Sequence, residues 1–223
     1  ANATLGVIPR GTGGDFRRTF GWEGDMASSL RRLTSPATLP LDVGRLEFET
    51  PEGRQATRYF VNICSFGASG LVDQEVNRRS KALGGKLSFM IGSARAMLRD
   101  KDQRVRIQVD EEPPEEIGVT TLAVANGRYF GGGMKVAPDA DPSDGLFDVT
   151  IWSGYTLVDF ALKSGALYDG SHVNLPGTRR LRCKRLTAES VDGSEVLLDV
   201  DGEQPGRLPC AIRIIPGALR LKT

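Results

Sequence analysis

Apolar and polar residues alternate along much of the chain after residue 37, which is the pattern of strands that bury one face. Segments 41–48 and 104–110 show this alternation clearly, and the run 119–125 is apolar enough for a buried strand. Further short strands are predicted at 58–64, 146–152, 180–184, 186–191, 195–200, 210–215 and 219–222. Strands at this spacing predict a mainly β fold, a two-layer β-sandwich rather than a parallel sheet.

Helical spacing of apolar residues is found in only a few segments. It predicts helices at 23–33, 71–99 and 155–167. The chain begins differently, with a short strand at 5–9, a glycine-rich turn and a helix start at 16–20. A strand, a glycine turn and a helix start together can form an anion site, because free N–H groups of the turn point at the ligand. The alternative is a glycine-rich helix start in which Asp15 serves the first helical turn.

Composition fits a soluble globular protein of 223 residues, with 39% hydrophobic and 26% charged residues. The net charge of +1 gives no electrostatic reason to expect nucleic acid as a partner. Three widely spaced cysteines indicate reduced thiols and a cytoplasmic location. No apolar run reaches the roughly 20 residues of a membrane span, so any lipid contact is expected to be peripheral.

A loop rich in glycine and aspartate follows the strand at 119–125. Gly131–Gly133 removes every Cβ over three positions, so a ligand or another backbone can approach closely. Asp139, Asp141 and Asp144 then gather three carboxylates, which repel unless they are solvated, protonated or bound to a cation. Oxygen ligands suit Mg²⁺ or Ca²⁺, although the EF-hand pattern fails here. An ordinary polar hairpin loop is the alternative.

A second acidic cluster lies near the end of the chain. Strand alternation predicts that Asp199, Asp201 and Glu203 share one face, about 7 Å apart. Carboxylates this close raise one another's pKa, which suits a general base, whereas a solvent-facing edge is the alternative. His172, the single histidine, has no nucleophile beside it in the sequence, so a structural role is predicted for it.

The run from Asn126 to Val149, NGRYFGGGMKVAPDADPSDGLFDV, resembles the C-terminal domain of diacylglycerol-kinase-like lipid kinases, which include bacterial diacylglycerol kinases and sphingosine kinases. The resemblance implies a Mg²⁺ held by Asp141, Asp144 and the backbone carbonyl of Leu146. The DGE sequence ending at Glu203 is similar to the C-terminus of the same family. It implies that Glu203 is the catalytic proton acceptor and that Asp201 orients it or holds metal.

The first residues resemble the closing motif of the nucleotide-binding domain in that family. LGVIPRGTGGDF matches its pattern, with Gly14 where the family usually has Asn. The resemblance implies an ATP site, with Gly11, Thr12 and Asp15 as the candidate nucleotide contacts. The family's upstream GGDGT motif does not occur in these residues. Residues 1–36 are therefore predicted to be the tail of an α/β nucleotide-binding domain, and residues 37–223 a complete β-sandwich domain.

These features together predict part of an ATP-dependent lipid kinase that uses Mg²⁺. It would transfer the γ-phosphoryl group to a diacylglycerol-like or sphingoid hydroxyl at a membrane surface. The 223 residues alone are expected to be inactive or nearly so, and a homodimer is one assembly left open. Two alternatives remain, a kinase of a soluble acceptor related to NAD kinase and a non-catalytic β-sandwich module. The helix at 71–99 would line an acyl groove or simply pack on the sheet.

Overall fold

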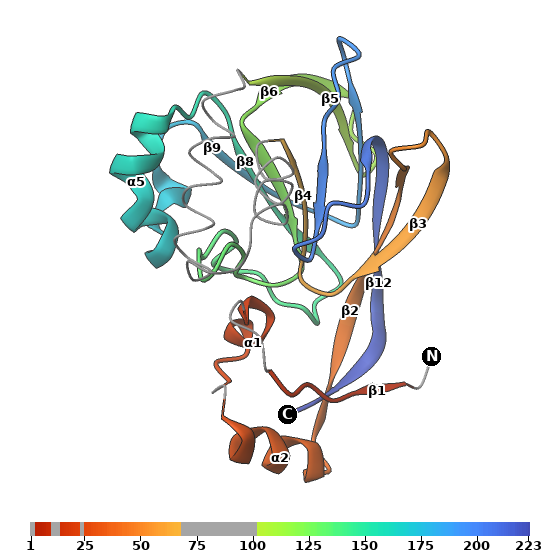
Figure 1. Ribbon diagram of the computed structural model, residues 1–223, viewed down its shortest axis with the longest axis vertical. Helices are drawn as coiled ribbons and strands as arrows, with labels where there is room; N and C mark the ends of the chain where they lie inside the picture. Colours follow the sequence, from red (N-terminus) through yellow and green to blue (C-terminus); the bar gives the residue numbers. More distant parts are fainter. Residues whose placement is uncertain (1–2, 10–13, 23–24, 68–101) are drawn as a thin grey trace.

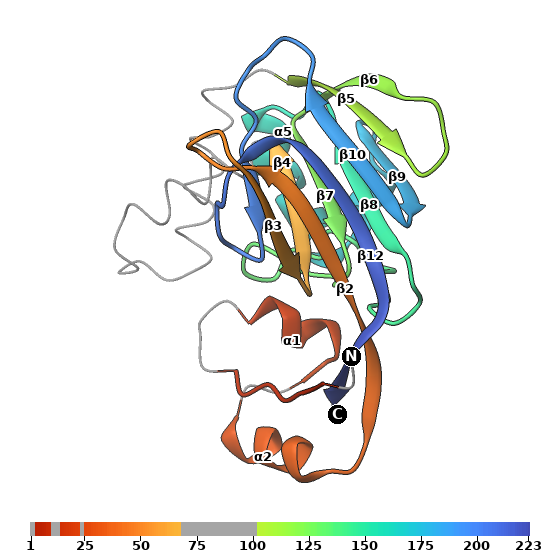
Figure 2. The same ribbon diagram turned by 90° about the vertical axis from the view of Figure 1, so that its right-hand side faces the viewer.

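The structure is a computed structural model that describes residues 3–9, 14–22, 25–67 and 102–223. Two largely antiparallel sheets pack face to face (Figure 2). The larger sheet has the order β3-β2-β12-β10-β5-β6, with β1 paired to β12, and the smaller has the order β11-β4-β7-β8-β9. The strands of the larger sheet are β1 (Thr4–Leu5), β2 (Thr38–Glu49), β3 (Gln55–Phe60), β5 (Gln103–Val109), β6 (Glu115–Val119), β10 (Arg185–Ser190) and β12 (Arg207–Lys222). Those of the smaller sheet are β4 (Ile63–Gly67), β7 (Thr121–Ala125), β8 (Phe147–Trp152), β9 (Thr178–Cys183) and β11 (Leu198–Val200). The predicted mainly β sandwich is confirmed.

The main core fills the space between the two sheets. Phe60 of β3 and Phe147 of β8 stack across it with ring centroids 5.6 Å apart. A Cβ on Gly44 would stand 2.2 Å from the Phe60 ring, so glycine is required at this point of β2. Full burial of each such side chain stabilises the fold by about 1.5–3 kcal/mol.

A second apolar cluster covers the outer face of the smaller sheet. Ile63, Ala123 and Trp152 of the sheet pack there with Val136 and with Leu167 of α5 (Leu157–Asp169). Strands β4 and β8 are consequently buried at every position. The sequence of β8, FDVTIW, still alternates, and Thr150 can be buried on the outer face because its hydroxyl donates a hydrogen bond to Val136 O at 2.8 Å.

The N-terminal segment lies at the far end of the two longest strands. Strands β2 and β12 run out of the sandwich, and α1 (Asp15–Thr19) and α2 (Met26–Thr34) lie near that end (Figure 1). The Asp25 side chain caps α2 by accepting a hydrogen bond from Ser28 N–H at 2.8 Å. Parallel pairing of β1 with β12 joins this segment to the larger sheet. The predicted division after residue 36 stays a prediction.

Some predicted element boundaries were wrong. The predicted strand 58–64 is divided between β3 and β4, because the chain crosses from one sheet to the other at residues 61 and 62. The predicted strands 210–215 and 219–222 form the single strand β12, which has a bulge between Ile215 and Leu219. The predicted helices at 23–33 and 155–167 are confirmed as α2 and α5. The predicted helix at 71–99 lies outside the described residues.

None of the helices in the described part of the chain is long and apolar enough to cross a membrane. The three cysteines, Cys64, Cys183 and Cys210, are buried free thiols, as the sequence predicts. Burial raises the pKa of the Cys183 thiol to about 12, so this side chain stays neutral and acts as a small apolar residue of the core.

Candidate functional site

Strand topology brings both acidic segments to one end of the smaller sheet. The glycine–acid loop, residues 126–146, connects the end of β7 to the start of β8. Ile63 at the start of β4 pairs with Ala125, and Val200 at the end of β11 pairs with Cys64. The turn after β11 therefore lies at the same end as this loop. Three strand spacings separate β11 from β8, about 14 Å across the sheet.

Helix α1 docks against this end of the sheet (Figure 1). The hydroxyl of Thr19 accepts a hydrogen bond from Arg128 N–H at 3.0 Å, and the Asp15 carboxylate accepts one from Gly132 N–H at 2.8 Å. The Asp15 carboxylate also pairs with Arg18. Burial raises the pKa of Asp15, while the Gly132 hydrogen bond and Arg18 oppose that rise. This carboxylate thus joins α1 to the glycine–acid loop through Gly132 and is paired within α1 by Arg18.

Of the three nucleotide contacts implied by the sequence, the structure describes only one. Gly11 and Thr12 lie outside the described residues. Asp15 is described, and its carboxylate is engaged by Gly132 and Arg18. A carboxylate repels phosphate groups, so Asp15 fits the role of holding the loop better than that of a direct phosphate ligand. A nucleotide contact by these three residues stays a prediction.

The chain turns sharply after β11. The prediction that Asp199, Asp201 and Glu203 share one face of a strand is therefore wrong. Asp201 has φ 52° and Gly202 has φ 88°, as the two central residues of a type I′ turn require. Val200 N–H donates to Glu203 O at 2.8 Å, and Glu203 N–H donates back to Val200 O at 3.1 Å. The extended geometry ends at Val200, so the period of two does not reach Glu203.

The three acids of this cluster consequently have separate partners. Asp199 is buried, and its carboxylate accepts hydrogen bonds from the Ser65 hydroxyl at 3.3 Å and Gly202 N–H at 3.0 Å. The Asp201 carboxylate accepts hydrogen bonds from three consecutive backbone N–H groups, those of residues 61, 62 and 63, at 2.9–3.1 Å. Glu203 pairs with Arg58 at 2.6 Å. Repulsion among three neighbouring carboxylates is therefore not the main feature of this corner.

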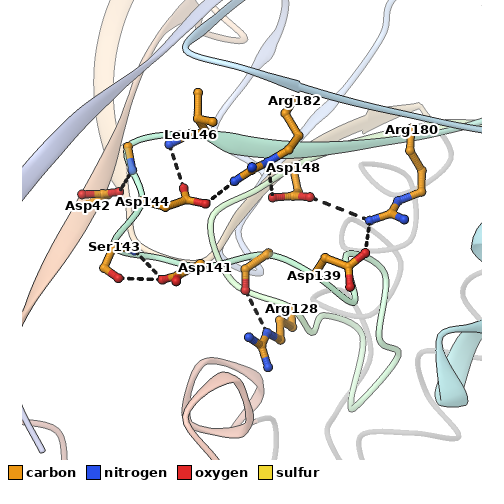
Figure 3. Close-up of polar contacts among 12 residues, drawn as sticks. Asp42, Arg128, Asp139, Asp141, Ser143, Asp144, Leu146, Asp148, Arg180 and Arg182 are labelled. Carbon is orange, nitrogen blue, oxygen red and sulfur yellow. Dashed lines mark hydrogen bonds and ion pairs between the residues drawn. The ribbon is translucent and has the colours of Figure 1, made fainter.

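The aspartates of the glycine–acid loop are also engaged (Figure 3). Asp141 Oδ1 accepts hydrogen bonds from the Ser143 N–H at 3.0 Å and the Ser143 hydroxyl at 2.6 Å. Asp144 Oδ1 accepts one from Leu146 N–H at 3.0 Å, and its Oδ2 contacts Arg182. Arg182 also reaches Asp148 at 3.3 Å. The guanidinium of Arg182 thus offsets the charge of two carboxylates.

A divalent cation fits this arrangement poorly as the side chains lie. The Asp144 carboxylate turns toward Arg182, and the Asp141 carboxylate turns toward Ser143, so the two do not converge (Figure 3). No group of three or more potential metal-binding side chains is found among the described residues. The Mg²⁺ ligands Asp141, Asp144 and Leu146 stay a prediction, and no catalytic step is derived through that ion.

Asp42 holds the glycine–acid loop in place, although the sequence analysis missed it. Its carboxylate is 1% exposed and accepts hydrogen bonds from Gly145 N–H at 2.7 Å and Gly217 N–H at 2.6 Å. Asn126 joins the same network, because its side-chain amide donates to Asp42 O at 3.0 Å and Val61 O at 2.9 Å. An aspartate between two apolar residues of a predicted strand, Leu41 and Val43, was the available signal.

His172 supports the glycine–acid loop from the outer side. Its ring is buried and its Nε2 lies 3.0 Å from Lys135 O, which fits an Nε2–H donor. Burial lowers the pKa of His172, so the neutral form is favoured. The Trp152 ring packs 5.3 Å away. These contacts agree with the predicted structural role.

Comparison with known proteins identifies related chains of greater length. A protein named Diacylglycerol kinase from Mycobacterium tuberculosis (strain CDC 1551 / Oshkosh) is 27% identical over 97% of this chain and 68% of its own length. A Probable lipid kinase YegS-like protein from Klebsiella pneumoniae (strain 342) is 26% identical over 98% and 68%. A Diacylglycerol kinase from Bacillus subtilis (strain 168) is 28% identical over 92% and 64%. This chain spans about two thirds of each relative.

A solved structure shows the same fold. The crystal structure described as a diacylglycerol kinase from Bacillus anthracis str. Sterne matches with a TM-score of 0.66 and 21% identity. The match covers 99% of this chain and 66% of that chain.

Two family models match successive parts of the sequence. A Diacylglycerol kinase catalytic domain model matches residues 1–46, and a model described as YegS C-terminal NAD kinase beta sandwich-like domain matches residues 62–223. The second match covers more than half of the chain. The chain belongs to the family of diacylglycerol-kinase-like lipid kinases that carry this C-terminal β-sandwich domain.

Proposed function

We propose that this chain forms part of an ATP-dependent kinase that phosphorylates the hydroxyl of a diacylglycerol-like or sphingoid lipid. One observation carries the proposal. Helix α1, which belongs to the stretch matched by the catalytic-domain model, packs at the same end of the smaller sheet as the turn that presents Glu203. Phosphoryl transfer needs the nucleotide and the group that accepts the hydroxyl proton to be positioned close together.

In this proposal Glu203 accepts the proton of the lipid hydroxyl as its oxygen attacks the γ-phosphorus. Its side chain is 67% exposed, so an incoming hydroxyl can reach it. ATP, when bound, supplies the phosphoryl group. Arg18 of α1 and Arg128 of the glycine–acid loop supply two guanidinium groups where α1 meets this loop, and these would offset phosphate charge. Asp15 and Thr19 hold α1 against that loop and so fix the distance between the two sides.

The decisive experiment compares acceptors and then removes the proposed base. The test protein contains these 223 residues preceded by a complete catalytic domain. It is incubated with ATP and with diacylglycerol, sphingosine or NAD as the acceptor. Phosphorylation of a lipid supports the proposal, and phosphorylation of NAD alone, or of none of the three, refutes it.

The Glu203→Gln variant tests the role of the residue. General-base catalysis contributes roughly 10²- to 10⁴-fold, so turnover is expected to fall by that factor while ATP binding is retained. Glu195→Gln is the matched control, since Glu195 is also an exposed acid near β11 and pairs with Arg207 at 3.0 Å. Unchanged turnover in Glu203→Gln would remove the base from the mechanism.

A further inference from the structure

Arg58 links the edges of the two sheets at the proposed proton acceptor. It lies on β3, an edge strand of the larger sheet, whereas Glu203 follows β11, an edge strand of the smaller sheet. Alternation along β3 places Arg58 on the same face as Ala56 and Phe60, both of which contact the core. The guanidinium therefore emerges between the sheets, on the side where the 200–203 turn lies.

The contact between Arg58 and Glu203 is specific to one oxygen. Arg58 Nη2 lies 2.6 Å from Oε2 of Glu203. Among the described residues no hydrogen bond or ion pair engages the other carboxylate oxygen, Oε1. One oxygen is thus held while the other is left to accept a proton.

The backbone beneath Glu203 is rigid, but its side chain is not held by packing. Reciprocal hydrogen bonds between Val200 and Glu203 close the turn, and Asp201 fastens it to the backbone of residues 61–63. The Glu203 side chain is 67% exposed, so packing does not restrict it to one rotamer, and ordering such a side chain costs conformational entropy. Arg58 is the side chain that restricts this motion, and its positive charge also attracts the Asp201 carboxylate.

We propose that Arg58 is the positioning residue of the proton acceptor, holding Glu203 by one carboxylate oxygen so that the other faces the lipid hydroxyl. This inference rests on the proposed function of Glu203. Arg58 itself would touch neither the nucleotide nor the transferred phosphoryl group. A misplaced catalytic group reduces the chemical step more than it weakens substrate binding, so the effect is expected in kcat.

The test uses the active polypeptide described above and two substitutions at one position. Arg58→Gln is expected to lower kcat about 10- to 100-fold with little change in the KM for ATP. Arg58→Lys keeps a charge that can reach Oε2 and is expected to recover part of that loss. The matched control is Arg54→Gln in the same hairpin, because Arg54 is 78% exposed and lies 3.9 Å from Glu52.

Two further readouts separate positioning from a general effect on the fold. Arg58→Gln is expected to lower the melting temperature by less than about 3 °C, as for an exposed ion pair. In a Glu203→Gln background, Arg58→Gln is expected to cause no further loss, because there is then no carboxylate to position.

The outcomes distinguish this inference from the proposed function. Full kcat in Arg58→Gln, or an equal additional loss in the Glu203→Gln background, overturns the positioning role while the lipid kinase assignment stands. Absence of lipid phosphorylation by the unsubstituted polypeptide instead refutes the proposed function.

Discussion

Replacement of Asp42 by asparagine tests how firmly the glycine–acid loop is anchored to the sandwich. The carboxylate of Asp42 accepts one hydrogen bond from Gly145 in the loop and one from Gly217 at the bulge of β12. Asparagine has nearly the same shape but only one acceptor atom, so its NH₂ group must face one of these two N–H groups. That N–H is then buried without a partner.

The expected cost follows from these contacts. A hydrogen bond to a charged group contributes about 1.5–3 kcal/mol, and a buried donor left without a partner loses about 1–3 kcal/mol. These two figures describe overlapping effects, so Asp42→Asn is expected to lower the free energy of unfolding by about 2–4 kcal/mol. Asp42→Ala removes both acceptors and is expected to cost more.

Urea unfolding of the 223-residue chain, followed by tryptophan fluorescence, measures this loss. Trp152 is 5% exposed and lies near the loop, so it reports on the transition. Amide exchange at Gly145 and Gly217 is expected to become faster in the variant. The matched control is Asp139→Asn, an exposed acid of the same loop paired with Arg180, for which less than about 1 kcal/mol is expected. Equal stability of the two variants would refute the anchoring role of Asp42.

Further predictions concern Asp15 and His172, which contact the glycine–acid loop, and two glycines, one with a close backbone neighbour and one without. Asp15→Asn is expected to speed amide exchange at Gly132, because the charged acceptor of that N–H is lost; unchanged exchange would argue against the α1 contact. Burial lowers the pKa of His172 below its unfolded value of about 6.5, so its contribution to stability is complete above that pH and is lost as the pH falls through the folded pKa. The stability difference between the natural chain and His172→Gln should therefore shrink from pH 7 to pH 5 in urea unfolding, and a constant difference would contradict the reasoning. Gly206→Ala is expected to destabilise by more than about 2 kcal/mol, since its Cβ would stand 2.1 Å from Glu49 O, whereas Gly165→Ala in α5 meets nothing within 4 Å and is expected to stabilise by about 0.5–1 kcal/mol. Thermal or urea unfolding of both variants checks the opposite signs.

Local patterns predicted much of the architecture. Alternation identified β2 and β5, because β5 and the second half of β2 turn every other residue toward the core. The amphipathic stretch before Pro36 and the apolar spacing after Tyr155 identified α2 and α5. Such patterns depend on neighbours within one or two turns of chain, so the sequence contains them directly.

The candidate site was harder to predict because its contacts join distant parts of the chain. Glu203 was selected through a family resemblance, but its partner Arg58 is separated from it by 145 positions. The expectation of three mutually repelling acids was wrong because Asp201–Gly202 forms a turn, a DG signal that was read as strand. Arg182 was not predicted as a partner of Asp144, because nothing in the local sequence around a strand arginine indicates which carboxylate it will pair with.

The sequence by itself determined the β-sandwich class, several helices and strands, and the family, because periodicity and contiguous motifs are local properties of the chain. Only the tertiary structure decided which charges meet. Antiparallel pairing of β11, β4, β7 and β8 places the 200–203 turn and the glycine–acid loop at one end of a sheet, and α1 docks there through Asp15 and Thr19. Charge pairing depends on distances of a few ångströms, which are set by strand order and register rather than by separation along the sequence.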